Sequence, residues 1–195
     1  MFNFFKRNKK EQNTVKQSVN DKDAQYVSDE KYSKMVNDYS VEDLALLVDY
    51  EEEPYVLSMD ELQYMLTICN DVKKRGVIYY AIATCYHKGT RGIIKSHKEG
   101  MQYDKKAMDA QNPYATLRYG VNLTLDVGKA VNAGTMDKDD AALEYALGVG
   151  YIVKSYRQGC PNAKDALEVL MEGRKEFYGA HSVEELVQKW PNSFK

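Results

Sequence analysis

The sequence predicts an all-α protein, and three observations support this fold class. Helix-start signals recur from residue 40 onward, no strand-like alternation of apolar and polar residues lies between them, and one helix-turn-helix pattern repeats. The chain has 195 residues, 44% of them hydrophobic and 29% charged, which is ordinary for a globular protein. We therefore expect most of the chain to fold around one sizeable core or a short array of helical units.

Four expected helices begin with a Ser that is followed three residues later by an acidic residue. In this pattern the two side chains satisfy free backbone amides of the first turn. Two further helices begin with a proline at the first helical position, where its missing amide costs nothing. The signals are Ser40 with Asp43, Ser58 with Glu61, Ser96 with Glu99, Ser182 with Glu185, Asn112-Pro113 and Cys160-Pro161.

Helix ends are predicted at Gly76, Gly89 and Pro191, because glycine often ends a helix and proline cannot continue one. A longer loop containing Gly128 and Gly134 is expected over residues 126–136. Together these signals predict helices at approximately 41–50, 59–75, 77–88, 97–111, 113–126, 137–157, 161–178 and 183–190.

The first 38 residues are expected to form a flexible basic tail, followed by a helical domain over residues 39–195. Residues 1–20 carry a net charge of +4, whereas the remaining chain carries −6. An acidic body repels a phosphate backbone, so we expect no nucleic-acid partner. Aromatic and basic side chains together favour weak contact with an anionic membrane surface, the alternative being a tail without a role. The membrane-contact candidates are Phe2, Phe4, Phe5, Lys6 and Arg7.

The chain is expected to be cytoplasmic. No stretch approaches the ~20 apolar residues of a membrane span, and the N-terminal Phe residues precede the basic cluster, which is the reverse of a secretory signal. Cys69, Cys85 and Cys160 are odd in number and lack a CxxC spacing. They are therefore expected to be reduced thiols in the core.

One helix-turn-helix unit runs from residue 77 to residue 115. Its pattern consists of Ile82-Ala83, Tyr86, Gly89, Gly92-Ile93, Ser96, Gly100, Tyr103, Ala107, Asn112 and Ala115. This pattern resembles the Sel1-like repeat, a relative of the tetratricopeptide repeat. The unit departs from that family in one inserted turn residue and at Ile78, Ser96 and Gly100. Small residues such as Ala83 and Gly100 allow paired helices to approach closely.

The resemblance weakens after residue 115. A second unit retains Tyr119-Gly120, Leu123, Ala142 and Tyr145, and a third half-unit begins at Ala163. The resemblance implies a short α-α superhelix, a solenoid of antiparallel helix pairs that stack on one another.

In such arrays the first helices of successive units line a concave surface that binds a partner protein. The resemblance thus implies a non-enzymatic interaction module, an adaptor or an inhibitor or immunity-type protein. The Lys-, Asn- and Tyr-rich composition is the reason to expect a bacterial or phage origin. Tyr79 and Tyr80 are adjacent on one helix and cannot both face inward, so one of them is a candidate contact residue. The partner-binding candidates are Tyr79, Thr84, His87, Thr116, Arg118, Asn122 and Lys164.

We expect no catalytic residues, no metal and no cofactor. The spacing of Gly89, Gly92 and Lys95 does not fit a phosphate-binding loop, and Cys85, His87 and His97 lack a fourth zinc ligand. Two alternatives stay open. Some Sel1-like proteins are reported as hydrolases, which would place a pocket beside the 126–136 loop, and the N-terminus could tether a scaffold to a membrane.

Overall fold

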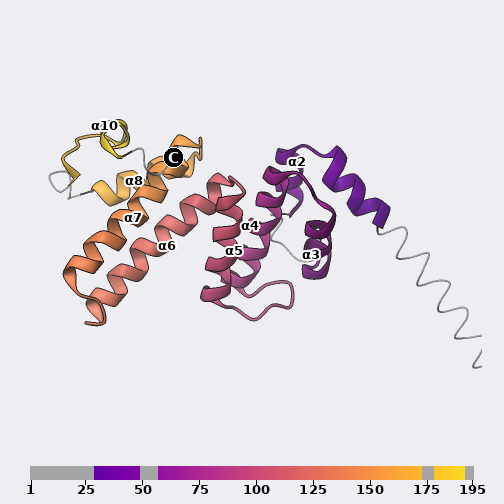
Figure 1. Ribbon diagram of the computed structural model, residues 1–195, viewed down its shortest axis with the longest axis horizontal. Helices are drawn as coiled ribbons and strands as arrows, with labels where there is room; N and C mark the ends of the chain where they lie inside the picture. Colours follow the sequence, from indigo (N-terminus) through magenta and orange to yellow (C-terminus); the bar gives the residue numbers. More distant parts are fainter. Residues whose placement is uncertain (1–28, 49–56, 173–177, 192–195) are drawn as a thin grey trace, which may run out of the picture.

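The computed structural model describes residues 29–48, 57–172 and 178–191, and within these ranges the secondary structure is entirely helical, as predicted. The helices follow the chain order from one end of the molecule to the other (Figure 1). No helix of the described ranges has the length and apolar composition needed to cross a bilayer. After a first helix at residues 29–38, the elements are α2 (Val41–Val48), α3 (Met59–Ile68), α4 (Val72–Lys88), α5 (His97–Asp109), α6 (Pro113–Asn132), α7 (Lys138–Arg157), α8 (Asn162–Met171) and α10 (Val183–Lys189).

All four Ser start signals are confirmed. Each Ser side chain accepts a hydrogen bond from the backbone amide three residues on, and Ser58 with Glu61 forms the complete reciprocal capping box. Asn112 accepts from the amide of Ala115 at 2.9 Å, with Pro113 at the first helical position. Pro161 lies one residue earlier than predicted, in the cap position of α8, and makes no side-chain cap.

The predicted boundary between the second and third helices is wrong. The helix expected to span 59–75 ends at Ile68, and α4 begins at Val72 with the Asp71 side chain accepting from the Lys74 amide. Gly76 lies inside α4, where an added Cβ would be 2.7 Å from the carbonyl oxygen of Ala110. This glycine therefore allows α4 to approach the end of α5, and it does not end a helix.

Two other predicted boundaries also need correction. Residues 29–38, expected to belong to the tail, form a helix whose Tyr32, Met35 and Val36 are buried. Residues 126–132, expected to be loop, continue α6, so the connection to α7 is only a short turn. Residues 1–28, with all membrane-contact candidates, lie outside the described part of the chain.

The described helices enclose two apolar cores. The first lies among helix 29–38, α2, α3 and α4, with Tyr103 of α5 packed against it. The second lies among α7, α8 and α10, with Leu117 and Val121 of α6 packed against it. All three cysteines are buried, as predicted, and burial raises the pKa of the Cys69 and Cys85 thiols.

Basic side chains bind the free carbonyl groups at the ends of several helices. Such carbonyls have no partner within their own helix and carry partial negative charge, so a cation there is stabilising. Lys74 and Arg75 are adjacent on α4, and they donate to carbonyl groups of helix 29–38 and of α3, respectively. The contacts join Lys74 to Val36 and Asn37, Arg75 to Leu66 and Cys69, Arg91 to Val48, and Arg157 to Val187 and Trp190.

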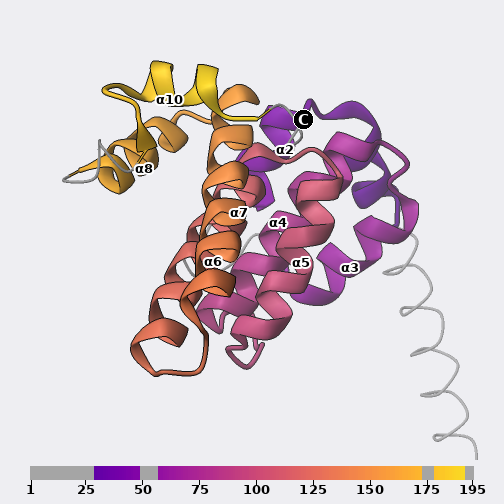
Figure 2. The same cartoon turned by 60° about the vertical axis from the view of Figure 1, so that its left-hand side comes forward.

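The α6 and α7 helices lie side by side and run in opposite directions (Figures 1 and 2). Their contact depends on glycine, because a Cβ on Gly120 would lie 2.7 Å from the carbonyl oxygen of Gly148. The α4 and α5 helices form a second adjacent pair (Figure 2). Contacts between α5 and α6 connect the two pairs, and the polar side chains at this junction form the candidate site.

Candidate functional site

A buried carboxylate lies at the junction of α4, α5 and α6. Asp104 of α5 has no exposed surface. Its oxygens accept two-pronged hydrogen bonds from Arg118 of α6 at 2.5–3.0 Å, and Nε2 of His87 from α4 lies 2.7 Å from Oδ2. A buried charge without partners would be strongly destabilising, so these contacts hold all three helices in one register.

The Arg118 guanidinium is held by several neighbouring groups and stays partly exposed. It donates to the Thr84 hydroxyl at 2.7 Å and to the Tyr80 carbonyl at 3.1 Å, in addition to Asp104. Its carbon centre lies 4.0 Å from the centroid of the Tyr80 ring, and Tyr114 lies beside that ring at 6.2 Å. We call Tyr80, Tyr114 and Arg118 the α4–α6 platform.

Local sequence explains why His87 reaches Asp104. Gly100 lies under the imidazole ring, and a Cβ there would be 2.5–2.7 Å from three ring atoms. Glycine at this position therefore lets the His87 ring lie against α5 while its Nε2 meets Asp104. The nearest atoms to a Cβ on Gly100 belong to the His87 side chain, so this glycine makes room for a ring of the paired helix.

A second histidine extends this polar cluster toward the surface. The His97 ring lies 5.6 Å from the His87 ring, and its Nε2 is 2.7 Å from Oδ2 of Asp126 on α6. Partial burial would raise the pKa of Asp126, but hydrogen bonds from His97 and Lys129 hold it below its ordinary value. The exposed His97–Asp126 pair thus adds a second polar contact between α5 and α6 to the buried Asp104–Arg118 pair.

Three of the seven partner-binding candidates meet in this cluster. Thr84, His87 and Arg118 are the ones that the structure brings together. Tyr79 lies on the other side of α4, where its hydroxyl accepts from Arg75 and its ring lies near Tyr103. It is therefore Tyr80, its neighbour, that joins Arg118.

The other three candidates are separate from the cluster. Thr116 is completely buried and donates to the carbonyl of Asn112, so a partner cannot touch its side chain in this conformation. Asn122 is half-buried on α6. Lys164 is exposed on α8 and bonds Glu184 at 3.1 Å, and this hydrogen bond raises the pKa of Lys164.

Sequence reasoning missed Asp104 and Tyr114, and of the adjacent pair Tyr79 and Tyr80 it placed Tyr79 among the partner-binding candidates. A signal for Asp104 exists, because Gly100, Asp104 and Ala107 follow a helical spacing of four and three and thus share the buried face of α5. A charged residue on such a face needs a partner of opposite charge. The sequence does not indicate that the partner is Arg118.

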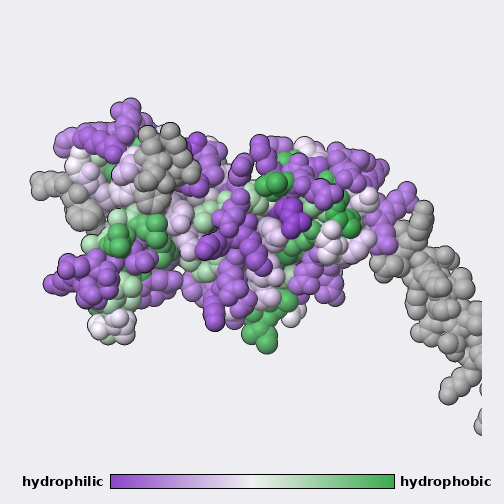
Figure 3. Space-filling view, in the orientation of Figure 1, coloured by the Kyte–Doolittle hydropathy of each residue, from purple (hydrophilic) through white to green (hydrophobic). Residues whose placement is uncertain are grey.

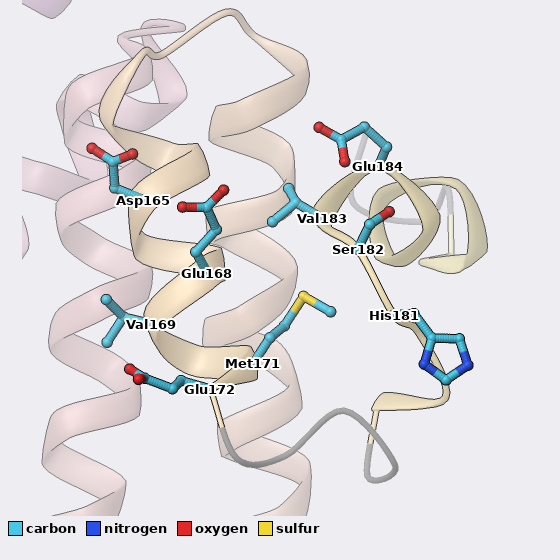
Figure 4. A pocket seen from close by; sticks show the side chains of 9 residues that line it. All are labelled: Asp165, Glu168, Val169, Met171, Glu172, His181, Ser182, Val183 and Glu184. Atoms are coloured by element: carbon cyan, nitrogen blue, oxygen red, sulfur yellow. The ribbon is translucent and has the colours of Figure 1, made fainter.

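A hollow of about 580 Å³ lies elsewhere, between α8 and the start of α10 (Figure 4). Val183 and Met171 line its apolar part, and Glu168 stands at the rim. None of its lining residues belongs to 126–136, where the hydrolase alternative expected a pocket. Among the residues that the structure describes, no three His, Cys, Asp or Glu side chains form a group that could hold a metal ion.

No family model, no curated protein and no solved structure matches this chain. The resemblance to the Sel1-like repeat therefore stays a prediction from the sequence. Contacts within this chain are therefore the basis for its fold and for the α4–α6 platform.

Proposed function

We propose that the protein is a non-enzymatic interaction module, a short solenoid of helix pairs that binds a partner protein across α4 and α6. The α4–α6 platform is the observation that carries this proposal. Tyr114 is 41% exposed, and the Arg118 side chain is 21% exposed although its guanidinium is fixed from below. Tyrosine and arginine are the residue types that dominate binding energy in protein interfaces.

The fixed position of Arg118 favours binding for an entropic reason. A free arginine side chain loses conformational freedom when a partner orders it, which costs roughly 0.5–1.5 kcal/mol per side chain. Arg118 is already ordered by Asp104, Thr84 and the Tyr80 ring. A partner that contacts the platform thus gains the contact without that loss.

The partner that fits this platform is a peptide or protein face with an apolar or aromatic group for the tyrosine rings. An acceptor group, such as a carbonyl or carboxylate, would complement the exposed edge of the Arg118 guanidinium. The acidic body of the chain disfavours nucleic acid. An adaptor and an inhibitor both work by such binding.

The test leaves Arg118 unchanged, because its loss would disturb the fold as well as the surface. Tyr114→Ala combined with Asn122→Ala removes one exposed and one half-buried side chain from α6. The matched control is Leu143→Ala combined with Gln102→Ala, which changes exposed residues on the second helices α7 and α5. Immobilised variants are used to capture proteins from the cells that make this chain.

The expected result is a partner protein that is retained by the wild type and by the control pair, and lost from the Tyr114/Asn122 variant. Thermal unfolding of each variant checks that the fold is unchanged. If all three proteins retain the partner equally, the surface across α4 and α6 is not the binding surface.

A further inference from the structure

The face formed by α8 and the start of α10 is acidic. Three carboxylates follow one another along the exposed side of α8 at a spacing of three and four residues, and a fourth stands on α10. In the space-filling view hydrophilic residues line the upper edge of this end of the molecule (Figure 3). The four residues are Asp165, Glu168, Glu172 and Glu184, which we call the α8–α10 acidic face.

One cation of the described residues, Lys164, contacts this face, and it binds Glu184 at 3.1 Å. The three carboxylates on α8 have like charges one turn apart, which is mutually unfavourable on a helix. A segment with several positive charges would relieve this repulsion.

The same face also has an apolar part. Val169 lies between the α8 carboxylates and is 69% exposed. Met171 and Val183 line the hollow between α8 and α10. A segment that fits this face therefore carries large apolar side chains next to its positive charges.

The chain itself contains such a segment. Residues 1–20 have five basic side chains and one acidic side chain, and three of the first five residues are phenylalanine. We infer that this basic N-terminal segment docks on the α8–α10 acidic face of the same molecule. Its charges pair with the α8 carboxylates, and its phenylalanine side chains cover Val169 and enter the hollow.

The chain is long enough for this contact. About 20 residues separate the basic cluster from residue 29, and an extended chain of that length reaches roughly 70 Å. The helix over 29–38 lies at one end of the described molecule and α8 lies toward the other (Figure 1), so the contact requires the intervening residues to run along the molecule in a largely extended form. Tethering makes the encounter of the segment with α8 an intramolecular one.

The test distinguishes this occupant from others with the same chemistry. Arg174 and Lys175 follow α8 directly in the sequence. A second copy of the chain could donate its own N-terminal segment, and an anionic membrane could bind that segment instead. The experiment must therefore report the position of residues 1–20 itself.

A spin label at residue 8 of the full chain provides that report. Asn8→Cys places a reactive thiol within the basic cluster, while Cys69, Cys85 and Cys160 are buried and protected from the label. We expect amide signals of α8 and of residues 181–184 to lose most of their NMR intensity at low salt. The loss should disappear at high salt, because exposed ion pairs are screened.

Charge reversal gives a matched comparison. Glu168→Lys with Glu172→Lys should restore the intensities, whereas Asp38→Lys with Asp109→Lys, two exposed positions outside this face, should leave the broadening unchanged. Full α8 intensity in the labelled wild type would overturn the inference. So would broadening that appears only between labelled and unlabelled molecules, or a segment that reaches anionic vesicles but not α8.

Discussion

At the scale of single residues, Asp104 and Arg118 are the pair on which the junction of α4, α5 and α6 depends. A buried ion pair contributes little net stability over an apolar pair, because both charges lose their hydration. Removal of one partner is different, since it leaves the other charge buried and alone. The pair therefore fixes how the helices meet more than it adds to the total free energy of unfolding.

A double-mutant cycle tests this view. We expect Arg118→Met and Asp104→Leu each to lower the free energy of unfolding by about 3 kcal/mol, the lower end for a broken buried pair because Arg118 is partly exposed. The double variant should lose less than the sum of the two, because it leaves no unpaired charge. Urea unfolding followed by circular dichroism measures all four proteins. Additive losses would contradict the coupling.

Tyr32 provides a residue-scale prediction about pH. Its hydroxyl donates to Glu61, and burial together with this contact raises its pKa to about 12. The folded state thus holds the tyrosine proton more tightly than the unfolded chain, whose tyrosines titrate near 10. This contribution is complete below pH 10 and is lost as the pH rises toward 12.

The variant Tyr32→Phe should therefore show a smaller loss of stability between pH 10 and 12 than the wild type. Thermal melting across this range measures the difference. Tyr114→Phe serves as the control, because Tyr114 lies on the exposed side of α6. If the melting temperatures of wild type and Tyr32→Phe fall equally between pH 10 and 12, Tyr32 is not the source of this pH dependence.

The candidate site could be predicted only in part, for a reason that lies in single residues. The resemblance names Thr84, His87 and Arg118 because it expects them on the first helices of successive units, and the structure brings these three side chains together. Asp104 was missed, since its contact with Arg118 depends on the rotation of α5 against α6. Tyr79 was chosen over Tyr80 because no local pattern distinguishes two adjacent tyrosines on one helix.

At the scale of helices, the contact between α6 and α7 provides a sharp comparison of two glycines. Gly120 faces the carbonyl oxygen of Gly148 and Ile152, whereas Gly128 on the same helix has nothing within 4 Å of an added Cβ. Alanine normally stabilises a helix relative to glycine by roughly 1 kcal/mol. Gly128→Ala should show this gain in urea unfolding.

Gly120→Ala should instead destabilise by about 1–3 kcal/mol, because backbone atoms of α7 would have to move away. The opposite signs of two identical substitutions on one helix separate packing from helix propensity. A gain for both variants would mean that α6 and α7 are less tightly packed than the distances indicate.

Helix starts were easier to predict than helix ends. A Ser cap and its acidic partner lie within four residues, so the sequence alone contains the whole interaction. The position of Gly76 inside α4 depends instead on the end of α5, more than thirty residues away. The start of α4 after the break has a local cap, Asp71, but this cap is outside the Ser pattern used for the prediction. The continuation of α6 to Asn132 likewise follows from its packing against α7.

At the scale of the whole molecule, the two apolar cores are joined by a polar junction. The all-helical class could be predicted, because capping and spacing are repeated along the chain. The predicted tail, residues 1–38, extends too far, since Tyr32, Met35 and Val36 belong to the first core. Each core forms among helices that are close together in the sequence, because most helix contacts join near neighbours along the chain.

This arrangement predicts how cooperatively the molecule unfolds. In an array in which each unit contacts only its neighbours, cooperativity depends on the free energy of the interface between units. In this chain the α4–α5 and α6–α7 pairs meet through contacts between α5 and α6, and the Asp104–Arg118 pair is one of these contacts. In the wild type, amides of α4 and α7 should exchange hydrogen through one common opening and respond equally to denaturant.

The Arg118→Met variant should separate these two responses, because a weaker junction lets one core open while the other stays folded. Hydrogen exchange followed by mass spectrometry at increasing urea measures, for each helix, the slope of the opening free energy against urea concentration. We expect equal slopes for α4 and α7 in the wild type and unequal slopes in the variant. Equal slopes in both proteins would show that contacts other than the Asp104–Arg118 pair join the two cores.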